Sequence, residues 1–151
     1  MTDFDFAPLI AAITSPAQAL GVFDSVNGHE PVSIPNSGLT CAVWAQEIAP
    51  NPQASGLAAT SVDVEFNVRL YTALNALAPD AIDPAMLNAA SALLGAYNGD
   101  FTLDGLVRDI DVLTAKAVAG YLLQDGQTLR IITISLPITI NDLWAQSAVT
   151  S

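Results

Sequence analysis

The clearest pattern in the sequence is a strict alternation of apolar and polar residues between positions 61 and 70. Successive side chains of a β-strand point to opposite faces of a sheet, so this alternation predicts a strand with one buried face. The polar face carries Asp63, Glu65 and Arg69. The apolar face consists of Val62, Val64, Phe66, Val68 and Leu70.

Further strands are predicted on both sides of this segment. A typical hairpin turn, Asp125-Gly126, separates the last two of them, because this pair of residues accepts positive φ angles. The expected ranges are 39–48, 103–113, 116–123 and 128–140.

The last of these strands has an irregular pattern. Its apolar residues change from odd to even positions at Ile131-Ile132. Either a β-bulge or burial of both faces of the strand explains this change. Pro137 cannot donate a hydrogen bond to a neighbouring strand, so we expect it at an edge of the sheet or where the strand leaves the sheet.

Apolar residues spaced three and four apart predict helical structure over residues 4–27. Ser15-Pro16 is expected to interrupt it and start a second helical piece, because Ser is a common N-cap and Pro is tolerated at the first helical position. Asn27-Gly28 is expected to end that piece. A later helix is predicted to begin at Asp83-Pro84 and to end at Asn98-Gly99.

Segments rich in proline and glycine separate these elements. Residues 29–38 and 49–56 are expected to form loops. The predicted order is helix, helix, strand, strand, helix and three strands, which favours antiparallel pairing with the helices on one face. We therefore predict a single α+β domain over residues 1–151, with a mostly antiparallel twisted sheet packed against two or three helices.

The composition favours a protein that packs against partners. Hydrophobic residues make up 52% of the chain and charged residues 13%, whereas about 25% is typical for charged residues. A surface with few charges is easier to dehydrate in an interface. A sequence that is simply rich in alanine and threonine is the alternative explanation.

Charge and hydropathy exclude some classes of function. The net charge is −11, and the four basic residues are scattered, which argues against specific binding of nucleic acid. The N-terminus is acidic where a signal peptide is basic. No apolar run is long enough to cross a bilayer. We therefore expect the chain to be made and to fold in a cytoplasm.

The sequence contains little that suggests catalysis. It has one histidine, His29, and one cysteine, Cys41, which lies in an apolar run typical of a buried small residue. The carboxylate pairs Asp63/Glu65 and Asp109/Asp111 could each bind a cation or act as acid and base, but solvated strand faces explain them better. We expect no enzyme activity, no cofactor and no metal site.

Several short segments, in this order along the chain, resemble the tail terminator, or tail completion, proteins of long-tailed phages (siphophages) that infect actinobacteria. Together they cover nearly the whole chain. Typical pieces are Asp24-Ser25-Val26-Asn27-Gly28 and Asn141-Asp142-Leu143-Trp144. The matching segments are residues 23–31, 38–44, 55–57, 66–71, 82–84, 99–103, 107–108, 119–121 and 137–144.

This resemblance implies a structural virion protein without catalytic residues. Such proteins form a homohexameric ring at the head-proximal end of the tail tube, end tube polymerisation and join the tail to the neck of the capsid. The implied partners are other copies of the chain, the tail tube protein and the head–tail connector. Another neck or tail-completion subunit remains an alternative, as does a non-viral domain that binds a small ligand or a peptide.

A closed ring needs two different surfaces on each subunit, and the sequence offers candidates for them. Tryptophan is enriched at interface hot spots, although core packing would explain either tryptophan equally well. The loop after residue 50 could reach a neighbour or the tube, or could be an ordinary hairpin loop. Because each copy carries −11, a channel lined with acidic groups would let DNA pass without binding it. The candidate interface residues are Trp44, Asn51, Gln53, Leu57, Asp63, Glu65, Arg69, Arg108, Pro137 and Trp144.

Overall fold

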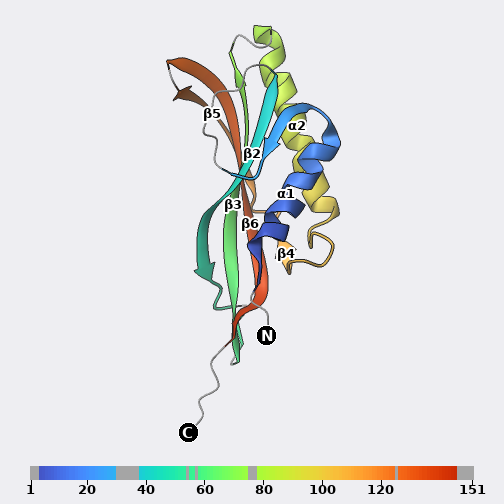
Figure 1. Ribbon diagram of the computed structural model, residues 1–151, viewed down its shortest axis with the longest axis vertical. Helices are drawn as coiled ribbons and strands as arrows, with labels where there is room; N and C mark the ends of the chain where they lie inside the picture. Colours follow the sequence, from blue (N-terminus) through green and yellow to red (C-terminus); the bar gives the residue numbers. More distant parts are fainter. Residues whose placement is uncertain are drawn as a thin grey trace.

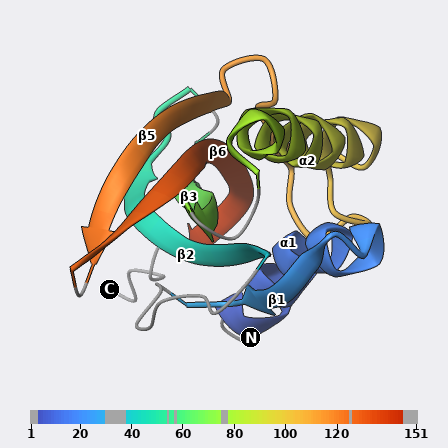
Figure 2. The same cartoon turned by 90° about the horizontal axis from the view of Figure 1, so that it is seen from above.

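The computed structural model describes residues 4–29, 38–53, 55–56, 58–74, 78–124 and 126–145. It is a single α+β domain in which two helices lie on one side of a curled sheet (Figures 1 and 2). The predicted fold class is confirmed. The elements are α1 (Phe6–Leu20), β1 (Phe23–Asn27), β2 (Leu39–Pro50), β3 (Ala59–Ala73), α2 (Pro79–Gly99), β4 (Asp109–Ile110), β5 (Lys116–Gln124) and β6 (Gln127–Ala145).

The sheet has the strand order β1-β2-β3-β6-β4, and β5 also pairs with β6. β4 and β5 therefore share one side of β6, with β4 beside Ile138 and Thr139 and β5 beside residues 127–135. All pairings are antiparallel except β1 with β2, which is parallel. The prediction of a mostly antiparallel sheet is thus confirmed, with a parallel exception at its β1 end.

The alternation in β3 produces the main core. Its even-numbered residues face α1 and α2 together with the even-numbered residues of β6, and the two central side chains, Phe66 and Leu136, lie opposite each other and are buried. Tyr97 of α2 crosses this core, where its hydroxyl donates a hydrogen bond of 2.7 Å to the carbonyl oxygen of Ile13 in α1. This bond joins the two helices over the sheet.

The opposite face of the sheet, called here the helix-free face, carries a second buried cluster at one end. Leu129 of β6 is fully buried there with Tyr71 and Ala73 of β3 and Ala42 of β2. Ile131 packs against the same cluster. β6 pairs with β3 without a register shift at this point. Burial of both faces, and not a bulge, therefore explains the irregular pattern at Ile131-Ile132.

The N-terminal prediction of two helical pieces is wrong in its second half. A single helix, α1, continues through Pro16 and ends at Leu20, where Gly21 adopts a φ of 69° and its N–H bonds to the carbonyl oxygen of Gln18. Residues 23–27 form β1. The register between β1 and β2 shifts after Phe23, so Phe23 and Val26 both pack against the main core. Because of this bulge, two apolar residues three positions apart lie on the same face of the strand, and this spacing is also typical of a helix.

The predicted start of the second long helix is also wrong, although its end at Gly99 is confirmed. α2 begins at Pro79 and contains Pro84 inside its first turns. The proline at the start of a helix needs no hydrogen-bond donor. The earlier start buries Ile82 in line with Met86 of the same apolar face.

The predicted strand over residues 103–113 is mostly absent. Only β4, Asp109–Ile110, is extended, and the residues before it form turns. Leu103, Asp104 and Gly105 have φ angles of 50°, 59° and 82°, a left-handed conformation that cannot continue a strand. By contrast, the predicted strands around 39–48, 116–123 and 128–140 are confirmed and extend further.

Pro137 is not at an edge of the sheet, so that prediction is wrong. It lies inside β6, opposite Glu65 of β3, and its carbonyl oxygen accepts a hydrogen bond of 2.9 Å from the backbone N–H of Asp111. The backbone nitrogen and the carbonyl group of a strand residue point to the same side of the strand. The Pro137 nitrogen, which carries no hydrogen, therefore faces the side of β6 where β5 and β4 pair. It lies at the gap between them, because β5 pairs with β6 as far as Ser135 and β4 pairs from Ile138 onward.

The β5–β6 hairpin is confirmed through the pairing of Gln124 with Gln127 and the φ of 76° at Gly126, whereas Asp125 lies outside the described residues. Most of the loop predicted at 29–38 also lies outside them. In the described part of the chain, no helix is long and apolar enough to cross a membrane.

Candidate functional site

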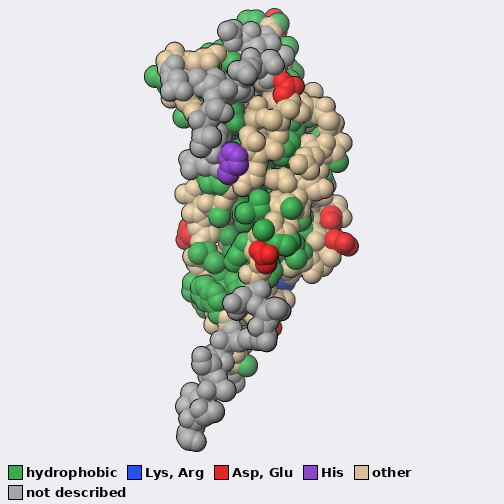
Figure 3. All heavy atoms as spheres, in the orientation of Figure 1, with side chains coloured by type: hydrophobic (Ala, Val, Ile, Leu, Met, Phe, Trp, Pro, Cys, Tyr) green, Lys and Arg blue, Asp and Glu red, His purple; other side chains and the backbone are tan. Residues whose placement is uncertain are grey.

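An apolar groove lies between the start of α1 and the second half of β2. Its volume is about 400 Å³. Figure 3 shows hydrophobic side chains gathered over this region, where α1 lies beside β2. Ile48 is 49% exposed although it lies opposite Val64, a residue of the main core. The groove is lined by Phe6, Ile10, Ala45, Gln46, Glu47, Ile48, Val64 and Phe66.

The groove borders a free strand edge. β1 pairs with β2 only as far as Ala42. Beyond that residue, no strand in the described ranges pairs with the outer edge of β2. A register shift between Ala45 and Glu47 changes the course of β2 at the groove. Unpaired backbone N–H and C=O groups on such an edge can bond to a strand of another chain.

β5 forms a second free edge, on the side of β6 that also carries β4. Among the described strands it pairs only with β6. Val118, Tyr121 and Leu123 are 61%, 65% and 71% exposed, so both faces of the strand present apolar side chains to solvent. Natural edge strands usually carry charges or prolines that block association. The sequence interpretation missed this surface. The signal was present, because apolar residues at 118, 121, 122 and 123 follow no alternation.

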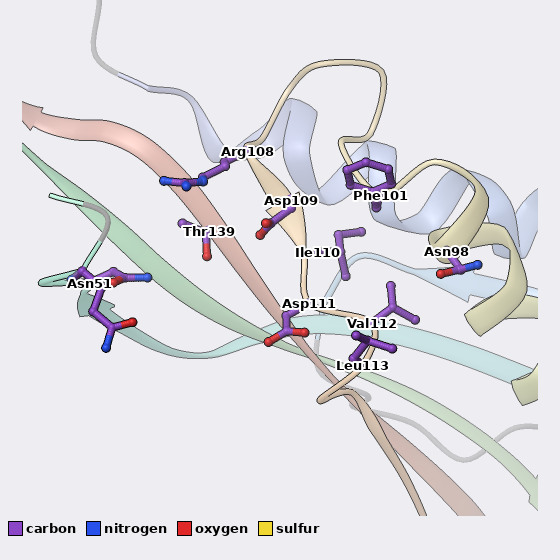
Figure 4. Close-up of a pocket in the computed structure, with 11 residues that line it drawn as sticks. Asn51, Asn98, Phe101, Arg108, Asp109, Ile110, Asp111, Val112, Leu113 and Thr139 are labelled. Carbon is purple, nitrogen blue, oxygen red and sulfur yellow. Dashed lines mark hydrogen bonds between the residues drawn. The ribbon is translucent and has the colours of Figure 1, made fainter.

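A polar pocket of about 530 Å³ lies beside β4 (Figure 4). It is bordered by β4, the end of α2 and the turn between β2 and β3. Arg108, Asp109 and Thr139 lie on its polar side, toward Asn51, and Phe101 lies on its apolar side. The pocket therefore brings together three of the predicted interface residues, Asn51, Gln53 and Arg108.

Asp63 organises the wall next to this pocket. Its Oδ1 accepts hydrogen bonds from Asn51 Nδ2 at 3.0 Å and from Thr139 Oγ1 at 2.8 Å. The Asn51 side-chain oxygen in turn accepts a bond of 3.0 Å from the backbone N–H of Gln53. One carboxylate thus ties the turn between β2 and β3 to the middle strand β6. Its role in the structure is to hold this turn.

We expect Asp63→Ala to lower the free energy of unfolding by about 1–2 kcal/mol, because two donors lose a charged acceptor in a partly buried position. Urea denaturation followed by circular dichroism measures this change. Asp111→Ala is the matched control, since the Asp111 side chain is exposed. Equal stability of the two variants would show that the Asp63 bonds do not hold the turn.

The arrangement contains little that could perform catalysis. In the described ranges, no group of three or more His, Cys, Asp or Glu side chains is placed to hold a metal ion. Cys41 is fully buried in β2, as the sequence indicated, and burial raises the pKa of its thiol to about 12. A thiol with such a pKa is protonated at neutral pH and is a poor nucleophile.

The remaining predicted residues lie on the helix-free face or at its ends. The Arg69 guanidinium stacks over the Trp44 ring at 5.0 Å, and Arg69 Nε donates to Thr133 Oγ1 at 3.0 Å. Trp44 also packs against the second buried cluster. Both residues are therefore engaged within the subunit, and Trp44 serves as packing at least in part.

The other candidates are separated from one another. Glu65 lies between Glu47 of β2 and Pro137 of β6. Trp144 is 45% exposed near the end of β6, opposite Thr60. Leu57 lies outside the described residues. The structure thus brings the pocket residues together, while the tryptophans lie at different places on the sheet.

No protein-family model matches the sequence, and no curated protein matches it significantly.

Proposed function

We propose that this protein is a non-enzymatic structural subunit that assembles with copies of itself. The observation that carries this proposal is β5, a free edge strand with three strongly exposed apolar side chains, Val118, Tyr121 and Leu123. Such an edge is prone to pair with another chain. Assembly into a closed ring would remove the free edges of every subunit from solvent.

The specific form proposed is a homohexameric ring at the head-proximal end of a siphophage tail tube. It would end polymerisation of the tube and join the tail to the neck of the capsid. The support for this form is the ordered resemblance of the sequence segments to tail terminators. The net charge of −11 suits a ring through which DNA passes without binding. The ring would be part of the virion, assembled in the cytoplasm of the bacterial host.

The test of assembly is the mass of the purified protein, measured by size-exclusion chromatography with light scattering over a range of concentrations. We expect hexamers that dissociate on dilution. Leu123→Lys should weaken this association at least tenfold, because it places a charge on the apolar edge of β5. Leu87→Lys is the matched control, since Leu87 is 58% exposed and lies on α2, outside both edge strands, and it should assemble like the wild type.

A wild-type protein that stays monomeric at high concentration would overturn the proposal. Position in the virion needs a separate measurement. Negative-stain imaging of phage particles with a labelled antibody should place the protein at the junction of tail and capsid. Label elsewhere in the neck would instead identify another neck subunit.

A monomeric peptide-binding domain is the second candidate function. The observation that favours it is the apolar groove beside the free edge of β2, because peptides add as strands to such edges. The same mass measurement separates the two candidates, since this domain would not form hexamers.

A further inference from the structure

We infer that β5 of one copy pairs with the free second half of β2 of the next copy, with Tyr121 entering the apolar groove. This inference rests on the proposed self-assembly and names the two surfaces that meet. Both surfaces are strand edges without a partner in the described part of the chain, β5 on its outer side and β2 from residue 43 to 50.

The two edges match in length. β5 spans Lys116–Gln124 and the free part of β2 spans residues 43–50. β1 pairs with β2 only as far as Ala42, so β1 does not block a strand that pairs with β2 after this residue. One strand can therefore satisfy nearly the whole row of free backbone groups on the other.

The two edges also match in direction. β2 runs antiparallel to β3, β3 antiparallel to β6, and β6 antiparallel to β5. β5 and β2 consequently run in opposite directions within one copy. If neighbouring copies have the same orientation about a ring axis, β5 meets the next β2 in the antiparallel arrangement, which is the commoner pairing.

The apolar faces then continue across the contact. Tyr121 lies opposite Arg130, an even-numbered residue of β6, and so points to the helix-covered face, as Leu123 does. Ile48 lies on the same face, opposite the core residue Val64. In a continuous sheet, residues of one face are neighbours across adjacent strands. With Lys116 at the end of β2, Tyr121 lies beside Ala45 in the groove and diagonal to Ile48, while Leu123 lies beside Val43.

The charges on the helix-free face are complementary in the same arrangement. Lys116, the only lysine, lies at the start of β5 on this face and forms no ion pair within the described residues. Antiparallel pairing brings it to the end of β2. The carboxylates of Asp63 and Glu65 lie there on the same face, opposite Ala49 and Glu47. The like-charged pair Glu47 and Glu65 is unfavourable within one copy, and a neighbouring lysine would offset it.

This contact uses two different surfaces of each copy, so it is heterologous and can close into a ring. β5 pairs with the β6 residues that lie opposite residues 67–73 of β3, whereas the free part of β2 lies opposite residues 62–68. Neighbouring copies are therefore offset along the strands. Tilted strands accommodate such an offset in a closed sheet.

The test is to mix two variants, Leu123→Lys with a disrupted β5 edge and Ile48→Lys with a disrupted groove. Each alone should associate at least tenfold more weakly than the wild type. An equal mixture retains one intact contact per pair, so light scattering should detect 1:1 heterodimers. Circular dichroism spectra and melting temperatures like those of the wild type establish that both variants fold.

A mixture that stays monomeric would overturn the inference, as would an Ile48→Lys variant that assembles like the wild type. If either result is obtained while the wild type still forms hexamers, self-assembly stands and only the assignment of the two surfaces fails. A monomeric wild type would instead overturn the proposed function itself.

A cysteine pair keeps the inference testable if Ile48→Lys does not fold. Oxidising an equal mixture of Ala119→Cys and Ile48→Cys chains should give a disulfide-linked heterodimer, because Ala119 lies beside Ile48 when residues 117–123 of β5 pair with residues 50–43 of β2. Leu87→Cys mixed with Ile48→Cys is the control and should give little product. Cys41 does not interfere, because it is fully buried. Equal yields in the two mixtures would contradict the contact.

Discussion

Replacing Leu136 with alanine should lower the free energy of unfolding by about 2–5 kcal/mol. Leu136 is fully buried at the centre of β6, opposite Phe66 of β3. The substitution removes apolar contacts and leaves a cavity between the sheet and the helices. The central strands are held on both sides, so they cannot easily move to fill it. Urea denaturation of the purified protein, followed by far-UV circular dichroism, measures the loss.

Leu87→Ala is the matched control for this prediction. It makes the same chemical change on α2, where Leu87 is 58% exposed. We expect its free energy of unfolding to change by less than about 0.5 kcal/mol. Similar losses for the two variants would mean that Leu136 does not occupy a closely packed core.

The second large effect is expected at alkaline pH. Burial raises the pKa of Cys41 from 9.0 to about 12 and also raises the pKa of Tyr97 above its ordinary value. Above pH 9 the unfolded chain loses the thiol proton while the folded chain keeps it. The folded state then binds more protons, so stability falls as pH rises. The contribution of Cys41 is complete below about pH 9 and is lost progressively towards pH 12.

The size of this effect follows from the shift. One pKa unit corresponds to about 1.4 kcal/mol, so Cys41 alone should cost about 4 kcal/mol of stability by pH 12. Urea denaturation at a series of pH values from 8 to about 11.5 measures the slope. Cys41→Ala should reduce the slope above pH 9, whatever its stability at neutral pH. An unchanged slope would show that the thiol is not buried in the folded protein.

These two effects concern the core, whereas the proposed assembly concerns the edges of the sheet. The edges carry exposed apolar side chains at Ile48, Val118, Tyr121 and Leu123, while the centre is covered by the helices. Variants at the edges should therefore change the mass of the assembly with little change in the stability of the subunit. This separation makes the two sets of experiments independent.

The sequence alone determined the strands in which one face is buried. In β3 the alternation of Val64 and Phe66 with Asp63 and Glu65 is a local consequence of strand geometry. The β5–β6 hairpin was likewise predictable, because its turn residues favour positive φ. The burial of Cys41 followed from its apolar neighbours. In each case the signal lies within a few residues of the feature.

The tertiary structure decided what depends on contacts between distant segments. Phe23 and Val26 have helical spacing but form a strand, because β2 offers a parallel partner and the core lies on one side of it. Leu129 is buried on the helix-free face only because β2 and β3 supply Ala42 and Tyr71 there. The free edges at β5 and β2 also arise from strand order, which no local pattern encodes, since the partners of a strand can lie anywhere in the chain.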